Sequence, residues 1–234
     1  MPNARTDSPR FQLPRFTKGA LALFLLTVGL TAFIGDQPVG ALLRVEPGAL
    51  LQGRGLWQPL TANFVFPAGG VGLVLGTLMT QWFIGSQLEA YWGTRRYVLL
   101  ALGCGFAGYL VYALLSPLLP ALPHGGSTAM DVAAVTAWGV AFGKQEFSLL
   151  GAVALRARTI AAIFVGMFMI GPMLRGEPWP LAIPGLVAIA GALLVTLQPW
   201  RAAGGGSGDR KPKRNKPRGK PSHLRVVKGE DLLN

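Results

Sequence analysis

The sequence predicts an all-α integral membrane protein, a bundle of six transmembrane helices with a long membrane-associated loop after the first. Three observations predict this class. Of the 234 residues, 51% are hydrophobic and only 14% are charged, whereas soluble domains have roughly 25% charged residues. The charges interrupt six apolar runs instead of being spread along the chain. Basic residues also gather in particular interruptions, as they do on the cytoplasmic side of membrane proteins.

The apolar runs, and therefore the expected helices, cover residues 20–35, 70–88, 97–118, 128–142, 159–174 and 179–199. A membrane-spanning helix needs about 20 residues, so the first run is somewhat short for a full span. Basic residues precede this run, which is also typical of a signal peptide. Because no clear A-x-A cleavage motif follows, we expect a retained helix.

Residues 36–68 form the long first loop. Within it, GALLRVEPGALL (40–51) is mostly apolar and predicts a short interfacial segment, from which Arg44 and Glu46 reach the lipid headgroups. Pro47 limits any helix there to a short piece. Trp57 is suited to the same interface, although an ordinary loop outside the membrane is an alternative interpretation.

The charged interruptions predict the orientation. Glu89, Arg95 and Arg96 lie between the second and third runs, and Lys144, Glu146, Arg156 and Arg158 between the fourth and fifth. The loop between the third and fourth runs has no Lys or Arg, and the one between the fifth and sixth has only Arg175. The positive-inside rule therefore places both termini in the cytoplasm. We expect a location in the bacterial inner (plasma) membrane.

The predicted domains are a cytoplasmic N-terminal tail (1–18), a membrane domain (19–199) and a basic cytoplasmic tail (200–234). Ten of the 22 basic and three of the ten acidic residues lie in 201–234, so this tail carries most of the net charge of +12. Glycine, proline and like charges cannot bury a core, which predicts disorder. Anionic lipid is the expected partner of the tail. A solvated tail that only aids orientation is the alternative.

Small residues in the expected helices indicate close helix packing, because lipid-embedded helices associate through such residues. Gly72 and Gly76 form a GxxxG pair in the second helix. Gly105 and Gly108, together with Ala101, are candidates for the same role in the third.

The stretch 57–97 resembles the rhomboid superfamily. Rhomboids have a Trp-Arg-x-x-Thr motif in the first loop, and this chain has Trp57 and Thr61 with Gln58 in place of Arg. Rhomboids end the second helix with Gly-x-x-x-Glu, then Gly and basic residues, and here the matching residues are Gly85, Glu89, Gly93, Arg95 and Arg96. The phrase WQPLTANFVF also resembles the Derlins, which are rhomboid-related proteins without protease activity.

The resemblance implies an intramembrane serine protease fold with a Ser nucleophile in Gly-x-Ser-Gly, a His base on the sixth helix, and a His and an Asn on the second. Ser127 occupies the nucleophile position, but Thr128 replaces the last Gly. The base position falls within residues 182–185, which contain no His. The second-helix positions fall near Leu73 and Thr77, of which only Thr77 can donate a hydrogen bond.

His124 is a weak candidate base, because it would have to fold back across two glycines onto Ser127. A structural interpretation of the segment is simpler. Thr128 would be the N-cap of the fourth helix and Asp131 its third residue, favoured by the helix dipole and close to the membrane interface. Glu89 is expected to contact a backbone amide or an ion-pair partner. Trp57 and Gln58 are expected to anchor the first loop in the bilayer.

The sequence therefore predicts a rhomboid-like pseudoprotease, Derlin-like, that binds the transmembrane segments of other proteins. Met167, Met169 and Met173 would make the fifth helix an adaptable surface, because methionine repacks readily. An active intramembrane serine protease using Ser127 is one alternative, and a scaffold that presents the basic tail to lipid or a soluble partner is another. No cofactor, metal site or nucleic-acid partner is expected, and the oligomeric state stays open.

Overall fold

The computed structural model describes residues 15–67, 71–120, 122–149, 153–174 and 176–197. Most of the predicted N-terminal tail and all of the basic tail lie outside these residues. Contacts divide the chain into two units, Met1–Gln198 and Pro199–Asn234. All the described residues lie in the first unit.

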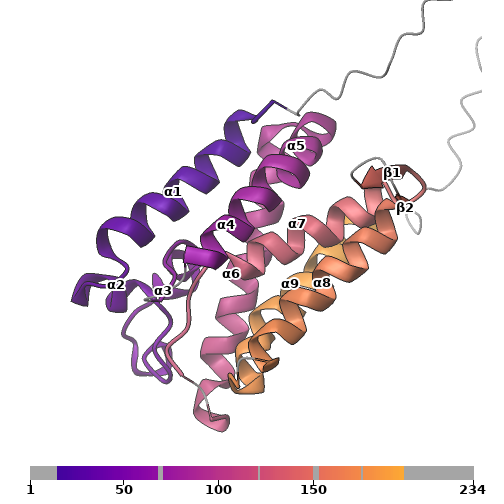
Figure 1. Ribbon diagram of the computed structural model, residues 1–234. Helices are drawn as coiled ribbons and strands as arrows, with labels where there is room; N and C mark the ends of the chain where they lie inside the picture. The colour runs from indigo at the N-terminus through magenta and orange to yellow at the C-terminus, as the bar shows by residue number, and fades with distance from the viewer. Residues whose placement is uncertain (1–14, 68–70, 121, 150–152, 175, 198–234) are drawn as a thin grey trace, which may run out of the picture. The chain divides into compact units, whose positions relative to one another are not determined.

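The described chain is mainly helical (Figure 1). Its longer helices are α1 (Lys18–Ile34), α4 (Val71–Met79), α5 (Ser86–Trp92), α6 (Thr94–Leu115), α7 (Thr128–Ala141), α8 (Ala157–Leu174) and α9 (Ile183–Leu197). Short helical pieces are α2 (Pro38–Leu43), η1 (Leu50–Gln52), α3 (Gln58–Thr61), η2 (Ala62–Phe64), η4 (Ser116–Leu118) and η5 (Trp179–Ala182). Each predicted apolar run therefore contains a helix.

Three of the described helical stretches are long and apolar enough to cross a membrane, namely Thr94–Leu118, Ala157–Leu174 and Trp179–Leu197. Helices α1 and α7 are also apolar but are shorter than these three. The second predicted run is not one regular helix, because the π-helical segment η3 (Thr80–Gly85) separates α4 from α5. A π turn is wider than an α turn and is often found at functional sites.

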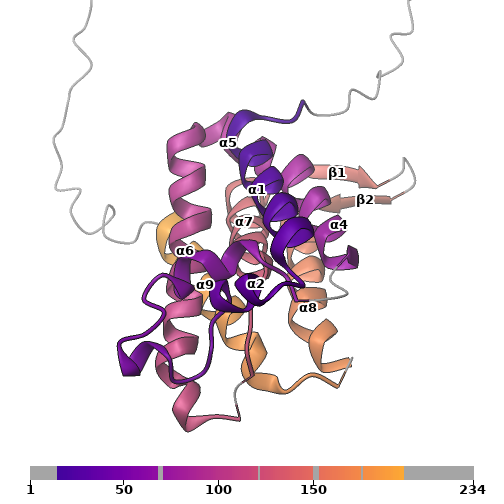
Figure 2. The same cartoon turned by 90° about the vertical axis from the view of Figure 1, so that its left-hand side faces the viewer.

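Helix α7 is the centre of the packing. Every residue from Ala129 to Gly139 is buried, as expected for a helix surrounded by other helices. In Figure 1, α7 lies between α4 and α5 on one side and α8 and α9 on the other, and the rotated view in Figure 2 shows α6 beside it. Its 14 residues span only about 21 Å, so a non-helical segment brings the chain to its buried start.

The glycine contacts differ from the prediction. A Cβ atom at Gly72 or Gly76 would have no neighbour within 4 Å, so these two glycines do not mediate helix packing. The glycines predicted for the third helix, Gly105 and Gly108, do mediate packing. A Cβ at Gly108 would overlap the backbone of Pro184 in α9, and one at Gly105 would overlap the side chains of Asn63 and Met130.

The first loop folds back on itself through side-chain hydrogen bonds. The buried Gln58 side chain accepts a hydrogen bond from the backbone N–H of Glu46 at 3.1 Å and donates one to Leu42. Thr61 Oγ1 donates to the Leu43 carbonyl at 2.8 Å. The Trp57 indole also donates to the Leu42 carbonyl, but Trp57 as a residue is 55% exposed. Gln58 thus holds the loop together from inside, and Trp57 is the side chain presented to the surroundings.

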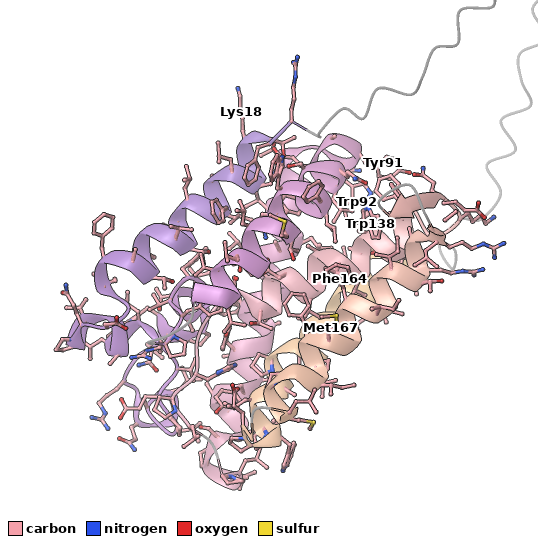
Figure 3. All side chains as sticks on the ribbon, in the orientation of Figure 1. Lys18, Tyr91, Trp92, Trp138, Phe164 and Met167 are labelled. Atoms are coloured by element: carbon pink, nitrogen blue, oxygen red, sulfur yellow. The ribbon has the colours of Figure 1, made fainter. Side chains whose placement is uncertain are left out.

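A β-hairpin that the sequence analysis did not predict connects α7 to α8. Strand β1 (Glu146–Leu149) pairs antiparallel with β2 (Val153–Arg156). The Trp138 ring packs on Phe147 of β1 at a centroid distance of 5.1 Å. Figure 3 shows that Tyr91, Trp92 and Trp138 lie near this end of the bundle, whereas Phe164 and Met167 lie further along α8.

Candidate functional site

Ser127 lies directly before α7 as its N-cap residue, and its side chain is fully buried (0% exposed). Its hydroxyl has two close partners. The Ser127 Oγ is 2.5 Å from the Thr77 Oγ1 of α4 and donates to Asp131 Oδ2 at 2.8 Å. A serine hydroxyl needs a proton acceptor to become a nucleophile, and these two oxygens are the groups that meet it.

Asp131 is one helical turn beyond Ser127 and joins three elements. Its Oδ2 lies 2.8 Å from the Thr77 hydroxyl, and its Oδ1 accepts a hydrogen bond from the Gln81 side-chain amide of η3 at 2.9 Å. The Tyr97 hydroxyl of α6 donates in turn to Gln81 Oε1. We call these five buried residues, Thr77, Gln81, Tyr97, Ser127 and Asp131, the polar cluster. It links α4, η3, α6 and α7 through their side chains.

One sequence prediction for this segment is wrong. The N-cap of α7 is Ser127 and not Thr128, and the Ser127 side chain makes no capping hydrogen bond. Asp131 lies in the first turn of α7, as expected, and is only 1% exposed. Its burial has a tertiary cause, because α7 packs against α4 and η3.

The structure places His124 away from the Ser127 hydroxyl. Its backbone forms an isolated antiparallel bridge with Val45 of the first loop, with N–O distances of 2.9 and 3.0 Å. Its ring packs against Tyr109 and Tyr112, with centroid distances of 5.6 and 5.7 Å. Among the hydrogen bonds of the described residues, none joins His124 to Ser127. The weak candidate base and the candidate nucleophile are therefore not brought together.

The same packing predicts an acid-sensitive stability. Burial lowers the pKa of His124 to about 4, and the nearby Glu177 opposes this shift, while a histidine in an unfolded chain titrates near a pKa of about 6.5. The folded state therefore favours neutral His124. Its stability relative to the unfolded state is highest above about pH 6.5 and decreases by up to about 3 kcal/mol as the pH falls towards 4. We expect His124→Phe to weaken the pH dependence of unfolding in detergent.

The control for this experiment is His223→Phe, which alters the other histidine of the chain. It should leave the pH dependence as in the wild type. Identical slopes between pH 6.5 and 4 for the wild type and His124→Phe would contradict the assignment.

The predicted base position on the sixth helix contains no titratable group. Ala182, Pro184 and Gly185 line a cavity, and Ile183 is buried. The Pro184 carbonyl lies against Gly108 of α6. In the second helix, Leu73 faces the cavity and Thr77 makes the hydrogen bonds described above. Thr77 is thus the expected donor, but its partners are Ser127 and Asp131.

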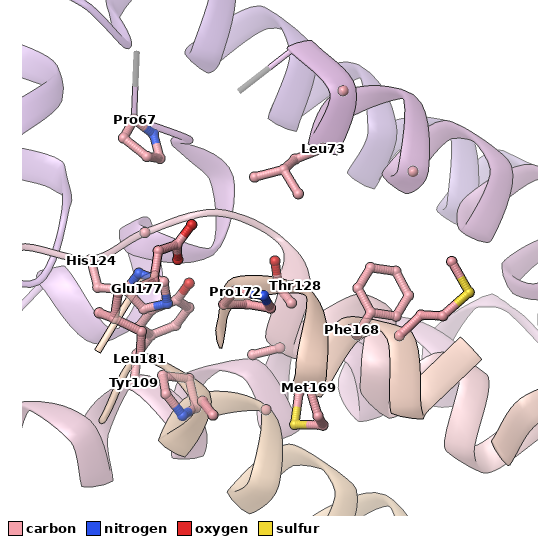
Figure 4. A pocket seen from close by; sticks show the side chains of 18 of the residues that line it. Pro67, Leu73, Tyr109, His124, Thr128, Phe168, Met169, Pro172, Glu177 and Leu181 are labelled. Atoms are coloured by element: carbon pink, nitrogen blue, oxygen red, sulfur yellow. The ribbon is translucent and has the colours of Figure 1, made fainter. Parts of the chain in front are cut away.

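The cavity has a volume of about 480 Å³ and lies beside the polar cluster. Figure 4 shows Leu73, Phe168, Met169 and Pro172 around it, with His124 and Glu177 at one side. Its walls come from α4, the segment before α7, α8, η5 and α9. Gly72 and Gly76 form part of the α4 wall, which explains why they have no packing partner. Neither Ser127 nor Asp131 is among the lining residues, so the cavity does not expose the polar cluster.

Glu89 forms a second site, at the other end of the second helical run. Its carboxylate accepts four hydrogen bonds: from the backbone N–H groups of Gly19 and Ala20 at 2.9 and 2.8 Å, and from the hydroxyls of Thr17 and Thr94 at 2.5 and 2.6 Å. Glu89 therefore caps α1 from 70 residues away in the chain. The expected amide contact is present. Arg95 and Arg96 are exposed at the start of α6.

Gln81 and Tyr97 were not among the residues predicted from the sequence, and Asp131 was expected to have a different role. The sequence spacing of four of the five cluster residues could have indicated the cluster. Thr77 and Gln81 are four residues apart, as are Ser127 and Asp131, and residues four apart share one face of a helix. Polar pairs at this spacing inside two apolar runs indicate that the runs face each other through them. Nothing comparable in the sequence connects Tyr97 to Gln81.

Among the described residues, no three His, Cys, Asp or Glu side chains form a group that could hold a metal ion. The comparison with protein families matches residues 53–198 to the model of the rhomboid domain. The matched region is more than half of the chain and contains both the polar cluster and Glu89. A search of curated proteins finds no match.

Proposed function

The chain belongs to the rhomboid family and is an integral membrane protein, and from this premise we propose that it is a pseudoprotease that binds transmembrane segments of other proteins. The observation that carries the proposal is the state of Ser127. Its hydroxyl is fully buried, is engaged by Thr77 and Asp131, and is absent from the cavity wall. Such a hydroxyl has no access to a peptide bond. The resemblance of the first-loop sequence WQPLTANFVF to the Derlins supports the same proposal.

The proposed arrangement has six membrane crossings and cytoplasmic termini. The six runs would be α1, the combined α4, η3 and α5, and then α6, α7, α8 and α9. The basic residues near the ends of these helices support this orientation, and the bacterial inner membrane is the proposed location. The basic tail would then lie beside an anionic lipid surface.

The cavity supports the binding role through its lining. Phe164, Met167 and Phe168 of α8 face it together with Met79 of α4. Methionine and aromatic side chains adapt to different apolar partners. A helix that carries large apolar side chains could place some of them in this space without exposing polar backbone to lipid.

The proposal predicts capture of membrane proteins at the cavity. We expect a photo-crosslinking residue at Leu73 or Phe164 to trap single-pass or multipass membrane proteins in native membranes. Gly76→Leu should reduce capture at least severalfold, because the new side chain enters the cavity, where nothing lies within 4 Å of a Cβ atom. Gly29→Leu is the matched control, since Gly29 in α1 is equally unhindered and does not line the cavity.

Equal capture by Gly76→Leu and wild type, with both proteins folded, would count against the cavity as the binding site. Measuring capture after deletion of residues 205–234 distinguishes the scaffold alternative from binding at the cavity. Capture that needs the tail and ignores the cavity would favour that alternative.

One observation favours an active serine protease as a second candidate: Asp131 Oδ2 is 2.8 Å from the Ser127 hydroxyl and could accept its proton. An activity-based serine probe distinguishes the two. We expect no labelling that depends on Ser127, because the hydroxyl is buried. Labelling of the wild type that is lost in Ser127→Ala would establish the protease and overturn the pseudoprotease proposal.

A further inference from the structure

Three oxygen atoms of the polar cluster form a triangle. The Ser127 Oγ and Thr77 Oγ1 are 2.5 Å apart, and each is 2.8 Å from the Asp131 Oδ2. All three separations are hydrogen-bond distances. Two oxygen atoms this close repel each other unless a hydrogen lies between them. The triangle therefore needs three hydrogens.

The two hydroxyls supply only two of these hydrogens, since each hydroxyl has one. An ionised carboxylate only accepts hydrogen bonds and adds none. The Thr77 hydroxyl also lies 3.1 Å from the Leu73 carbonyl, and a hydrogen bond there would need one more hydrogen. A carboxylic acid protonated on Oδ2 both donates and accepts. With it, each oxygen of the triangle donates one hydrogen bond and accepts one.

Glu89 provides the contrast within the same molecule. Its four contacts come from two backbone N–H groups and two threonine hydroxyls, and each donor brings its own hydrogen. Four donors match the acceptor sites of an ionised carboxylate. The hydrogen count thus distinguishes the two sites: the donors around Glu89 match an anion, whereas the triangle that contains Asp131 Oδ2 is one hydrogen short.

We infer that Asp131 is a buried proton-holding site: it carries a proton on Oδ2 at neutral pH and closes a ring of hydrogen bonds with Ser127 and Thr77. The inference is independent of what the cavity binds.

The surroundings of Asp131 agree with a neutral acid. The groups that face it are Thr77 of α4, Gln81 of η3, Ser127 of the same segment, and the nearby tyrosines Tyr97 and Tyr109 of α6. Of the salt bridges in the described part of the chain, none involves Asp131. A charge buried without a partner inside a membrane protein is costly, and a bound proton removes that charge.

The ring also has a chemical consequence for Ser127. A neutral carboxylic acid has no strong tendency to take a second proton, so it does not act as a base for the serine. Asp131 lies where a base for Ser127 would be needed, but in its protonated form it donates a hydrogen bond instead. The proton on Asp131 thus converts a potential catalytic pair into a link between α4 and α7.

Infrared spectroscopy of the purified protein in lipid at neutral pH tests the inference. The carbonyl stretch of a protonated carboxylic acid should be present in the wild type and absent in Asp131→Asn. Glu89→Gln and Asp36→Asn should retain the band; Asp36 is exposed, so the second control folds even if the first does not. Ser127→Ala should shift the band, because one partner of the acid is lost.

A wild-type spectrum without the band would overturn the inference, as would a band that survives in folded Asp131→Asn. A band that depends on Asp131 but is identical in Ser127→Ala would place the proton outside the triangle. Folding of Asp131→Asn is expected, because its amide N–H can donate where the acid did. These outcomes do not involve client capture, so they stand or fall separately from the proposed function.

Discussion

Glu89→Ala is expected to lower the free energy of unfolding by about 4 kcal/mol, because it leaves four donors without an acceptor. Two of them are backbone N–H groups in the first turn of α1, from Gly19 and Ala20, and two are the hydroxyls of Thr17 and Thr94. A hydrogen bond to a charged group contributes about 1.5–3 kcal/mol, and water can replace part of the loss at a helix end. Reversible unfolding in mixed micelles measures the effect.

The matched control is Glu146→Ala. Glu146 forms an ion pair with Arg156 at 3.8 Å, and both side chains are more than half exposed. Exposed pairs contribute about 0–1 kcal/mol, so this variant should unfold nearly as the wild type does. Similar unfolding of the two variants would show that Glu89 does not hold α1 to the rest of the bundle. Glu89→Gln should fall between them, because it keeps the shape but replaces an acceptor with a donor.

Gly108→Ala is expected to destabilise the protein by about 3 kcal/mol, as overpacking of a tight core does. A Cβ atom there would overlap the Cα, carbonyl carbon and carbonyl oxygen of Pro184. These are backbone atoms, so no rotamer change relieves the overlap, and α6 and α9 must separate. The separation would loosen the buried contacts of α7 as well, because α7 packs on both helices.

Gly103→Ala, five residues earlier on α6, is the control for this prediction. A Cβ atom at Gly103 meets nothing within 4 Å, and alanine favours a helix over glycine by about 0.5–1 kcal/mol. This variant should therefore be at least as stable as the wild type. The thermal midpoints of the two variants, measured in the same detergent, give the comparison. Equal midpoints would mean that α6 and α9 are not in the close contact described.

The Gly108 prediction shows why contacts between helices are harder to predict from the sequence than the helices themselves. The glycine spacing favoured Gly72 and Gly76, yet these residues line a cavity, whereas Gly108 makes the backbone contact. A GxxxG pair states only that a close approach is possible on one face of a helix. Which face meets a neighbour depends on the rotation of the helix in the bundle, and no local pattern determines that rotation.

The sequence by itself determined the helical segments, the membrane character, the family and the position of Ser127, because these follow from runs of apolar residues and from motifs within a few dozen positions. It also indicated the amide contact of Glu89, through the resemblance of one motif. Only the tertiary structure decided what surrounds Ser127. Thr77 and Gln81 reach Ser127 and Asp131 from 50 to 54 residues earlier in the chain, and Tyr97 joins them through Gln81. Side chains brought together by helix packing leave no continuous signature in the sequence, since their distance depends on how whole helices lie against one another.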